Sequence, residues 1–205
     1  MQTQIQVMLD LQDAMNTRVH SDWRQQGFEW YRAIWIECAE LMDHYGWKWW
    51  KKQTPDIDQV KLEVIDIWHF GLSMLLVNNT SATMIEEQLS SAFKKESAND
   101  FLESVELFAG DVLVSKTFSI EKFTCMLTAS GMSFDELYTG YVGKNVLNFF
   151  RQDHGYKEGT YHKLWGGKED NEHLVELVNT IDTSANDFKE KLYAALDSRY
   201  QTLCL

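Results

Sequence analysis

The fold of this chain is decided by two segments, Ala33-Ile34-Trp35-Ile36-Glu37-Cys38-Ala39-Glu40-Leu41-Met42 and Leu62-Glu63-Val64-Ile65-Asp66-Ile67-Trp68-His69-Phe70. From Tyr31 to Tyr45 the apolar residues recur every three or four positions, which is the spacing of one face of an α-helix. Ile36 and Ala39 lie off that face, so this helix is apolar nearly all round. We therefore predict an all-α helical bundle whose core is built on two buried acidic helices.

Each of these helices carries two carboxylates three residues apart, Glu37 with Glu40 and Glu63 with Asp66. This spacing places both acids of a pair on the same face of a helix. Burying a carboxylate costs several kcal/mol, and neither helix has a basic residue beside its pair. A solvated acidic face is the ordinary alternative, but the apolar flanks leave little polar face for it. Carboxylate oxygens suit Mg²⁺, with Mn²⁺ as a substitute, so the pattern predicts a divalent cation site.

The rest of the sequence also favours helices, because it has one proline and few alternating runs. Its length of 205 residues suits one core, so we expect a single all-α catalytic domain over residues 1–205. Residues 82–131 carry no chemical motif and form a candidate semi-independent helical insert. Gly46 is expected to end the first acidic helix, while Thr54 and Pro55 are expected to start the second, which ends near Val77. Further helices are expected at about 4–18, 84–95, 99–115, 119–130, 133–153, 171–180 and 184–202.

The net charge of −12 argues against a partner that is a nucleic-acid polymer or an anionic membrane, since both require a basic face. The three cysteines have no paired spacing, which is typical of reduced thiols. No signal peptide and no long apolar run are found. We therefore expect a cytoplasmic protein.

Polar residues elsewhere suggest that the site accepts a nucleotide. Gln12 and Asn16 are amides on the apolar stripe of the first helix, where they either bond to backbone or recognise the edge of a planar ligand. The run from Trp47 to Lys52 combines tryptophans with lysines, which suits either base stacking or packing against a partner subunit.

A basic face follows on the helix that the Ser133 and Glu136 capping box is expected to start. Lys144, Asn148 and Arg151 share this face because they recur at helical spacing. Basic side chains and a divalent cation together can bind a polyphosphate. There is no Walker-type glycine-rich loop, so a P-loop enzyme is excluded. The residues alone indicate a Mg²⁺-dependent hydrolase of a nucleoside polyphosphate and leave the base open.

Several blocks together resemble the dimeric all-α dUTP pyrophosphatase family (dUTPase/dCTPase), which belongs to the all-α NTP pyrophosphohydrolase superfamily. The matching blocks are spread over the chain from about residue 12 to residue 171, whereas residues 78–131 and the C-terminal tail carry none of them. These blocks are Glu37-Cys38-Ala39-Glu40-Leu41-Met42-Asp43, Trp47-Lys48-Trp49-Trp50-Lys51, Glu63 to Phe70, Gly143 to Asn148, Arg151 to Lys157, and Gly167-Lys168-Glu169-Asp170-Asn171.

The resemblance implies a homodimer that hydrolyses dUTP, and dUDP as well, at the α-phosphorus to give dUMP. It implies that a metal-bound water is the nucleophile, with either Glu37 or Glu40 as its base. By matching position, the implied catalytic and metal ligands are Glu37, Glu40, Glu63 and Asp66, with Asn148 as a further candidate ligand. The implied phosphate-binding residues are Lys144, Arg151, Lys157 and Lys168. The implied base and sugar pocket consists of Gln12, Asn16, Trp47, Trp50, His69 and Asn145.

Three alternatives remain at this point. The nearest is a dCTP or dual dCTP/dUTP pyrophosphatase, because a terminal amide can rotate to bind either pyrimidine. A di-iron carboxylate protein is a remote alternative based on the spacing of Asp66 and His69, although the first acidic helix offers no matching histidine. The other remote alternative is a non-enzymatic helical interaction module.

Overall fold

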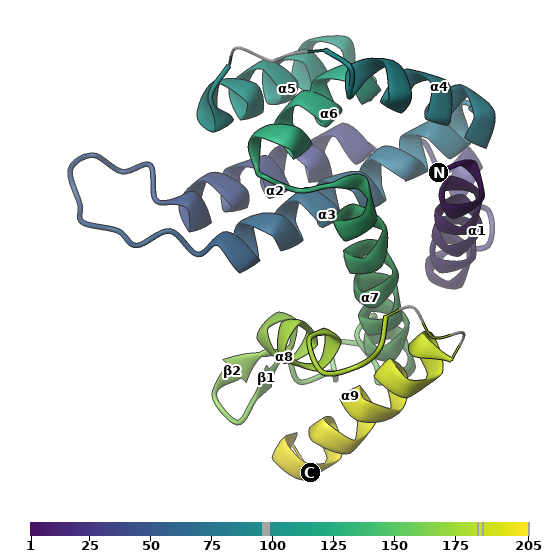
Figure 1. Ribbon diagram of the computed structural model, residues 1–205. Coiled ribbons are helices and arrows are strands. Elements are labelled where there is room, and N and C mark those ends of the chain that lie inside the picture. Colours follow the sequence, from purple (N-terminus) through teal and green to yellow (C-terminus); the bar gives the residue numbers. More distant parts are fainter. Residues whose placement is uncertain (96–98, 184, 186, 205) are drawn as a thin grey trace.

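The prediction of an all-α fold is confirmed by a computed structural model, which describes residues 1–95, 99–183, 185 and 187–204 (Figure 1). Within these residues the only strands are β1 (Leu164–Trp165) and β2 (Lys168–Glu169), which form an antiparallel hairpin that the sequence did not suggest. A short 3-10 helix, η1, covers Trp23–Gln25. The α-helices are α1 (Gln2–Val19), α2 (Trp30–Tyr45), α3 (Ile57–Val77), α4 (Ala82–Ala92), α5 (Phe101–Ser115), α6 (Ile120–Ala129), α7 (Phe134–Asp153), α8 (Asp170–Val178) and α9 (Phe188–Cys204).

Helix α3, the second acidic helix, lies in the core of the molecule, as predicted. It packs against α2, α1 and α7, and its sequence buries side chains on nearly every side, including Trp68 and His69. The helix ends at Val77 as expected, but the prediction of its start was wrong. Asp56 is the N-cap, and its side chain accepts a hydrogen bond from the backbone N–H of Gln59. Asp56 satisfies a free N–H group of the first turn better than Thr54 could, two residues further back.

Helix α2 differs from the prediction, because it lies at the surface of the single chain. It buries only Ile34, Cys38 and Leu41, whereas Trp35 is 44% exposed and Ile36 is 51% exposed. Its end agrees with the prediction, since Gly46 adopts the left-handed conformation at φ 79°. The apolar residues off its main stripe therefore face outward, and the inference that the helix is enclosed by its own chain was wrong.

Helices α4, α5 and α6 occupy the segment predicted as a candidate insert and lie at the top of Figure 1. Their buried residues belong to the same hydrophobic core as α3, and Phe123 of α6 stacks on Trp68 of α3 with ring centroids 4.9 Å apart. Helix α7 begins with the predicted Ser133 and Glu136 capping box and ends at Asp153. The hairpin, α8 and α9 lie beside the C-terminal half of α7.

None of the helices in the described part of the chain is both long enough and apolar enough to cross a membrane.

Candidate functional site

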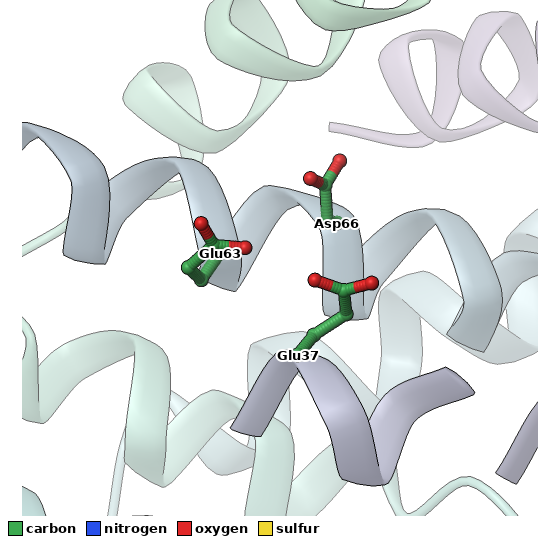
Figure 2. A group of neighbouring side chains, drawn as sticks. All are labelled: Glu37, Glu63 and Asp66. Atoms are coloured by element: carbon green, nitrogen blue, oxygen red, sulfur yellow. The ribbon is translucent and has the colours of Figure 1, made fainter. Parts of the chain in front are cut away.

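Three of the four predicted acids come together between α2 and α3 (Figure 2). Glu37 extends from α2 toward α3, which carries Glu63 and Asp66 one turn apart. Each residue offers a carboxylate oxygen, and these oxygens lie within 4.8 Å of one another. Glu63 is 4% exposed and Glu37 is half-buried, so the group is largely shielded from water.

The acidic group is short of positive charge. Burial, reinforced by the charge of Asp66, raises the pKa of Glu37 to about 9. Burial and Asp66 also raise the pKa of Glu63 above its ordinary value. Crowded carboxylates ionise reluctantly because each charge is desolvated and repelled by the others. A small divalent cation would remove both penalties, and an all-oxygen donor set of this kind fits Mg²⁺ or Mn²⁺.

One basic side chain does reach this group, and it comes from a third helix. Lys144 of α7 is 2% exposed, and its Nζ lies 2.8 Å from Asp66 Oδ2. The same Nζ donates a hydrogen bond to Asn171 Oδ1 at 2.8 Å. His44 adds a weaker contact, with Nε2 3.6 Å from Glu63 Oε1. The Lys144–Asp66 pair could not be predicted from local patterns, because the two residues are far apart along the chain.

Glu40 does not join the three acids. It is exposed on α2, one turn beyond Glu37, although its charge still acts on Glu37 and Glu63. Asn148 lies on the wall of the cavity next to the acids, and its Oδ1 accepts a hydrogen bond from Arg151 at 3.2 Å.

A cavity of about 420 Å³ opens beside the acids, between α1, α2, α3 and α7. This volume is within the range of sites for small molecules and cofactors. The cavity brings together Glu37 and Asp66 with the predicted residues Gln12, Asn16, His69, Asn148 and Arg151. The remaining lining residues are Met15, Val19, Trp23, Phe28, Trp30, Phe70, Gln152 and Tyr156.

The aromatic side chains of this wall were not identified from the sequence. Trp30 lies between Phe28 and Phe70, with ring centroids 5.4 Å and 6.2 Å away. Trp23 contacts Trp30 edge to face at 6.1 Å. A cluster of this kind offers a flat apolar wall for a base or sugar. Trp23, Phe28 and Trp30 lie close together in the sequence, but their spacing carries no signal that they share a cavity wall with Phe70.

The amides Gln12 and Asn16 are buried in a hydrogen-bonded network with α3. Gln12 Nε2 donates to Asn16 Oδ1 at 2.9 Å and to Ser73 Oγ at 3.2 Å. Asn16 Nδ2 donates to Ser73 Oγ at 2.9 Å. Gln12 Oε1 lies 2.8 Å from Nδ1 of His69, whose ring stacks on Tyr141 with centroids 4.2 Å apart. Bonds to backbone were the ordinary expectation for these amides, but side chains provide most of their partners.

The predicted phosphate-binding residues have different surroundings. Arg151 lines the cavity and forms a bidentate pair with the fully buried Asp170, with distances of 2.8 and 2.7 Å. Lys157 is exposed and donates a hydrogen bond to the carbonyl oxygen of Val19 at 2.8 Å, near the rim. Lys168 lies on β2 and pairs with Glu176 at 2.6 Å, and it does not line the cavity.

Trp47, Trp50 and Asn145 also lie outside the cavity. The two tryptophans are on the loop between α2 and α3, which projects to the left in Figure 1, and they are 39% and 56% exposed. Asn145 is buried on α7 and lines a separate hollow together with residues of α1 and α9. The structure therefore does not bring these three predicted base-pocket residues to the cavity.

Comparison with known families gives one match. A family described as dUTPase matches residues 4–156, which is more than half of the chain and includes every residue that lines the cavity. No curated protein compared with the chain matches it.

Proposed function

Because this chain belongs to the dUTPase family and is a dUTP diphosphatase, we propose that it hydrolyses dUTP in the cavity between α1, α2, α3 and α7. The observation that carries this proposal is the position of Glu37 and Asp66, which line the same cavity as the amides of α1. The carboxylates suited to a metal ion and the amides suited to the edge of a nucleobase thus line the same cavity. A dUTP molecule could span them.

We assign Glu37, Glu63 and Asp66 as ligands of Mg²⁺. Two further residues are candidate ligands: Glu40, one helical turn from Glu37, and Asn148, on the cavity wall. When bound, the cation supplies positive charge for the phosphates and makes a bound water more acidic. Arg151 and Lys144 donate hydrogen bonds to phosphate oxygens, which requires both to exchange part of their present carboxylate contacts. Lys157 would contact the outer phosphates from the rim.

In the reaction, water attacks the α-phosphorus while the bond to the bridging oxygen breaks, giving dUMP and pyrophosphate. Glu37 or Glu40 accepts the proton from this water. The same attack on dUDP would release phosphate. The aromatic wall of Trp30 and Phe70 holds the nucleoside and excludes water from the reacting atoms.

Removal of metal is the direct test of this assignment. We expect pyrophosphate release from dUTP in the presence of Mg²⁺, loss of turnover after addition of a chelator, and recovery with excess Mg²⁺ or Mn²⁺. The same assay with dUDP should give dUMP and phosphate. Turnover that continues unchanged in excess chelator would contradict the role of the acidic group.

We further propose that the whole chain is a single catalytic domain that works as a homodimer in the cytoplasm. Support for the domain is the core shared between α3 and α4–α6. Support for the dimer is the exposure of apolar residues on two helices that pack along each other. Tyr45 of α2 contacts Phe101 of α5 at one end, and Lys116 lies over Tyr31 at the other. The exposed residues on this pair of helices are Trp35, Ile36, Leu107, Leu113 and Val114.

A charge on this surface should separate the subunits. We expect Ile36→Lys to reduce the mass measured by light scattering from that of a dimer to that of a monomer, because a lysine would be buried at the interface. Leu164→Lys on β1 is the matched control, since Leu164 is 62% exposed and lies far along the chain from α2. A wild-type protein that is monomeric at micromolar concentration would contradict the proposed dimer.

A further inference from the structure

We propose that Ser73 fixes the hydrogen-bonding pattern with which the cavity recognises the base, and that this pattern favours uracil over cytosine. The inference rests on the proposed function, because it takes the cavity as the dUTP site. Ser73 does not line the cavity, so it is a positioning residue that acts through Asn16, Gln12 and His69.

The Ser73 hydroxyl can only accept hydrogen bonds from α1. Ser73 is fully buried, and its Oγ donates its single hydrogen to the carbonyl oxygen of His69, 3.1 Å away in the preceding turn. The lone pairs that remain on Oγ face Gln12 Nε2 at 3.2 Å and Asn16 Nδ2 at 2.9 Å. Both amides must therefore direct their NH₂ groups toward Ser73, because their carbonyl oxygens would find no donor there.

This orientation determines which nitrogen of His69 carries a hydrogen. With its NH₂ group on Ser73, Gln12 directs Oε1 toward His69 Nδ1 at 2.8 Å. The Tyr141 hydroxyl lies within hydrogen-bond distance of two acceptors, the carbonyl oxygen of Met8 at 2.9 Å and Gln12 Oε1 at 3.0 Å. An amide oxygen only accepts, so Nδ1 is the protonated nitrogen. Burial lowers the pKa of His69 to about 4, so the ring is neutral near pH 7. Nε2 is then a bare acceptor.

His69 Nε2 has the properties of a ligand contact. His69 is 5% exposed and lines the cavity, and among the described residues Nε2 is buried without a hydrogen-bond partner. A buried acceptor of this kind is costly unless something donates to it. Asn16 lines the same cavity and supplies the complementary group. Ser73 takes one of the two hydrogens on Asn16 Nδ2, and within the described part of the chain no acceptor is found for the other.

Two residues that line the cavity thus carry complementary unpaired groups, an acceptor on His69 Nε2 and a donor hydrogen on Asn16 Nδ2. Uracil carries the complementary pair, an N3–H group next to a carbonyl oxygen. Cytosine carries the reverse pair, a bare N3 next to an amino group. With cytosine, the lone pair of N3 would face the lone pair of His69 Nε2, and the amino group would face the NH₂ group of Asn16. A site that leaves buried polar groups unpaired in this way rejects a ligand strongly.

The test is Ser73→Ala, assayed with dUTP and dCTP under the same conditions. Without the hydroxyl, both amides are free to rotate and His69 can take either tautomer. We expect the ratio of kcat/KM for dUTP to that for dCTP to fall by about tenfold or more. Ser104→Ala is the matched control, because Ser104 is also buried and donates to the carbonyl of Asp100 at 2.8 Å, but on α5. We expect Ser104→Ala to leave the ratio unchanged.

A second measurement reports the tautomer without any substrate. Nitrogen-15 NMR of the imidazole ring should show Nδ1 protonated in the wild-type protein and a mixture of tautomers in Ser73→Ala. A wild-type His69 that carries its hydrogen on Nε2 would overturn the inference, even if the variant does not fold. An unchanged dUTP to dCTP ratio in a folded Ser73→Ala variant would also overturn it. Failure of the metal test would instead remove the proposed function and leave the tautomer as measured.

Discussion

Replacement of Glu37 by glutamine is expected to lower kcat for dUTP hydrolysis by about a thousandfold or more while leaving the protein folded. Glu37 is the only member of the acidic group contributed by α2, so its loss leaves Glu63 and Asp66 on one helix without the opposing ligand. A cation held from one side only would no longer be fixed against the phosphates, and electrostatic stabilisation of the reacting group is a large contribution to such reactions. The measurement is pyrophosphate release at saturating dUTP and Mg²⁺.

The fold should tolerate this change because of the state of Glu37 in the metal-free protein. Its pKa of about 9 means that the side chain is already neutral near pH 7, so a neutral glutamine of the same shape replaces it at little cost. We expect the thermal unfolding midpoint of the metal-free variant to equal or exceed that of the wild type. Asp58→Asn is a matched control, because it removes one negative charge from an exposed position on the first turn of α3. Full activity in Glu37→Gln, or loss of activity in Asp58→Asn, would contradict the assignment.

The acidic helices illustrate how much the sequence could predict. The three-residue spacing placed Glu63 and Asp66 on one face of α3, as the structure has them, and three of the four acids expected together do meet. The fourth, Glu40, is exposed and does not join them. The same reasoning overestimated the burial of α2, because an apolar residue on a helix can face either the core of its own chain or a surface. Periodicity does not distinguish these two cases, so the sequence pattern could not show that Ile36 lies on the surface of the chain.

The base side of the cavity was harder to predict. Gln12 and Asn16 stood out because an amide on an apolar stripe needs a partner, but the partner, Ser73, is a single serine among apolar residues and has no signature of its own. Trp47 and Trp50 suggested base stacking by composition, whereas the structure places Trp30 and Phe70 on the cavity wall. Tertiary packing selects among aromatic residues, and no local pattern encodes that choice.

Local sequence patterns could not predict the Arg151–Asp170 pair either, and this pair gives Arg151 a second expected role. Its role in binding phosphate was predicted from the helix face that it shares with Lys144 and Asn148. The structure adds a structural role, because Arg151 links α7 to the first residue of α8 through a carboxylate with no exposed surface. Tyr161 donates a further hydrogen bond to Asp170 Oδ2 at 2.8 Å.

Arg151→Ala is therefore expected to lower the free energy of unfolding by about 3–5 kcal/mol near pH 7, since it leaves a buried carboxylate without its cation. Burial raises the pKa of Asp170, but the hydrogen bonds and charge of Arg151 outweigh burial and hold the pKa below the ordinary 3.8. The contribution of the pair is thus present above pH 3.8 and is lost as the pH falls through the lowered pKa. Urea unfolding without substrate should show the difference between wild type and variant shrinking at acid pH.

Two companion variants separate charge from geometry in this prediction. Arg151→Lys keeps the positive charge but loses the two-pronged contact, so its loss of stability should be smaller than that of Arg151→Ala. The double variant Arg151→Ala with Asp170→Asn removes the buried charge as well and should recover part of the stability. Equal free energies of unfolding for Arg151→Ala and the wild type at neutral pH would contradict the prediction, because they would mean that the pair with Asp170 contributes little to stability. Because the assay contains no nucleotide, its outcome is independent of whether Arg151 also binds phosphate.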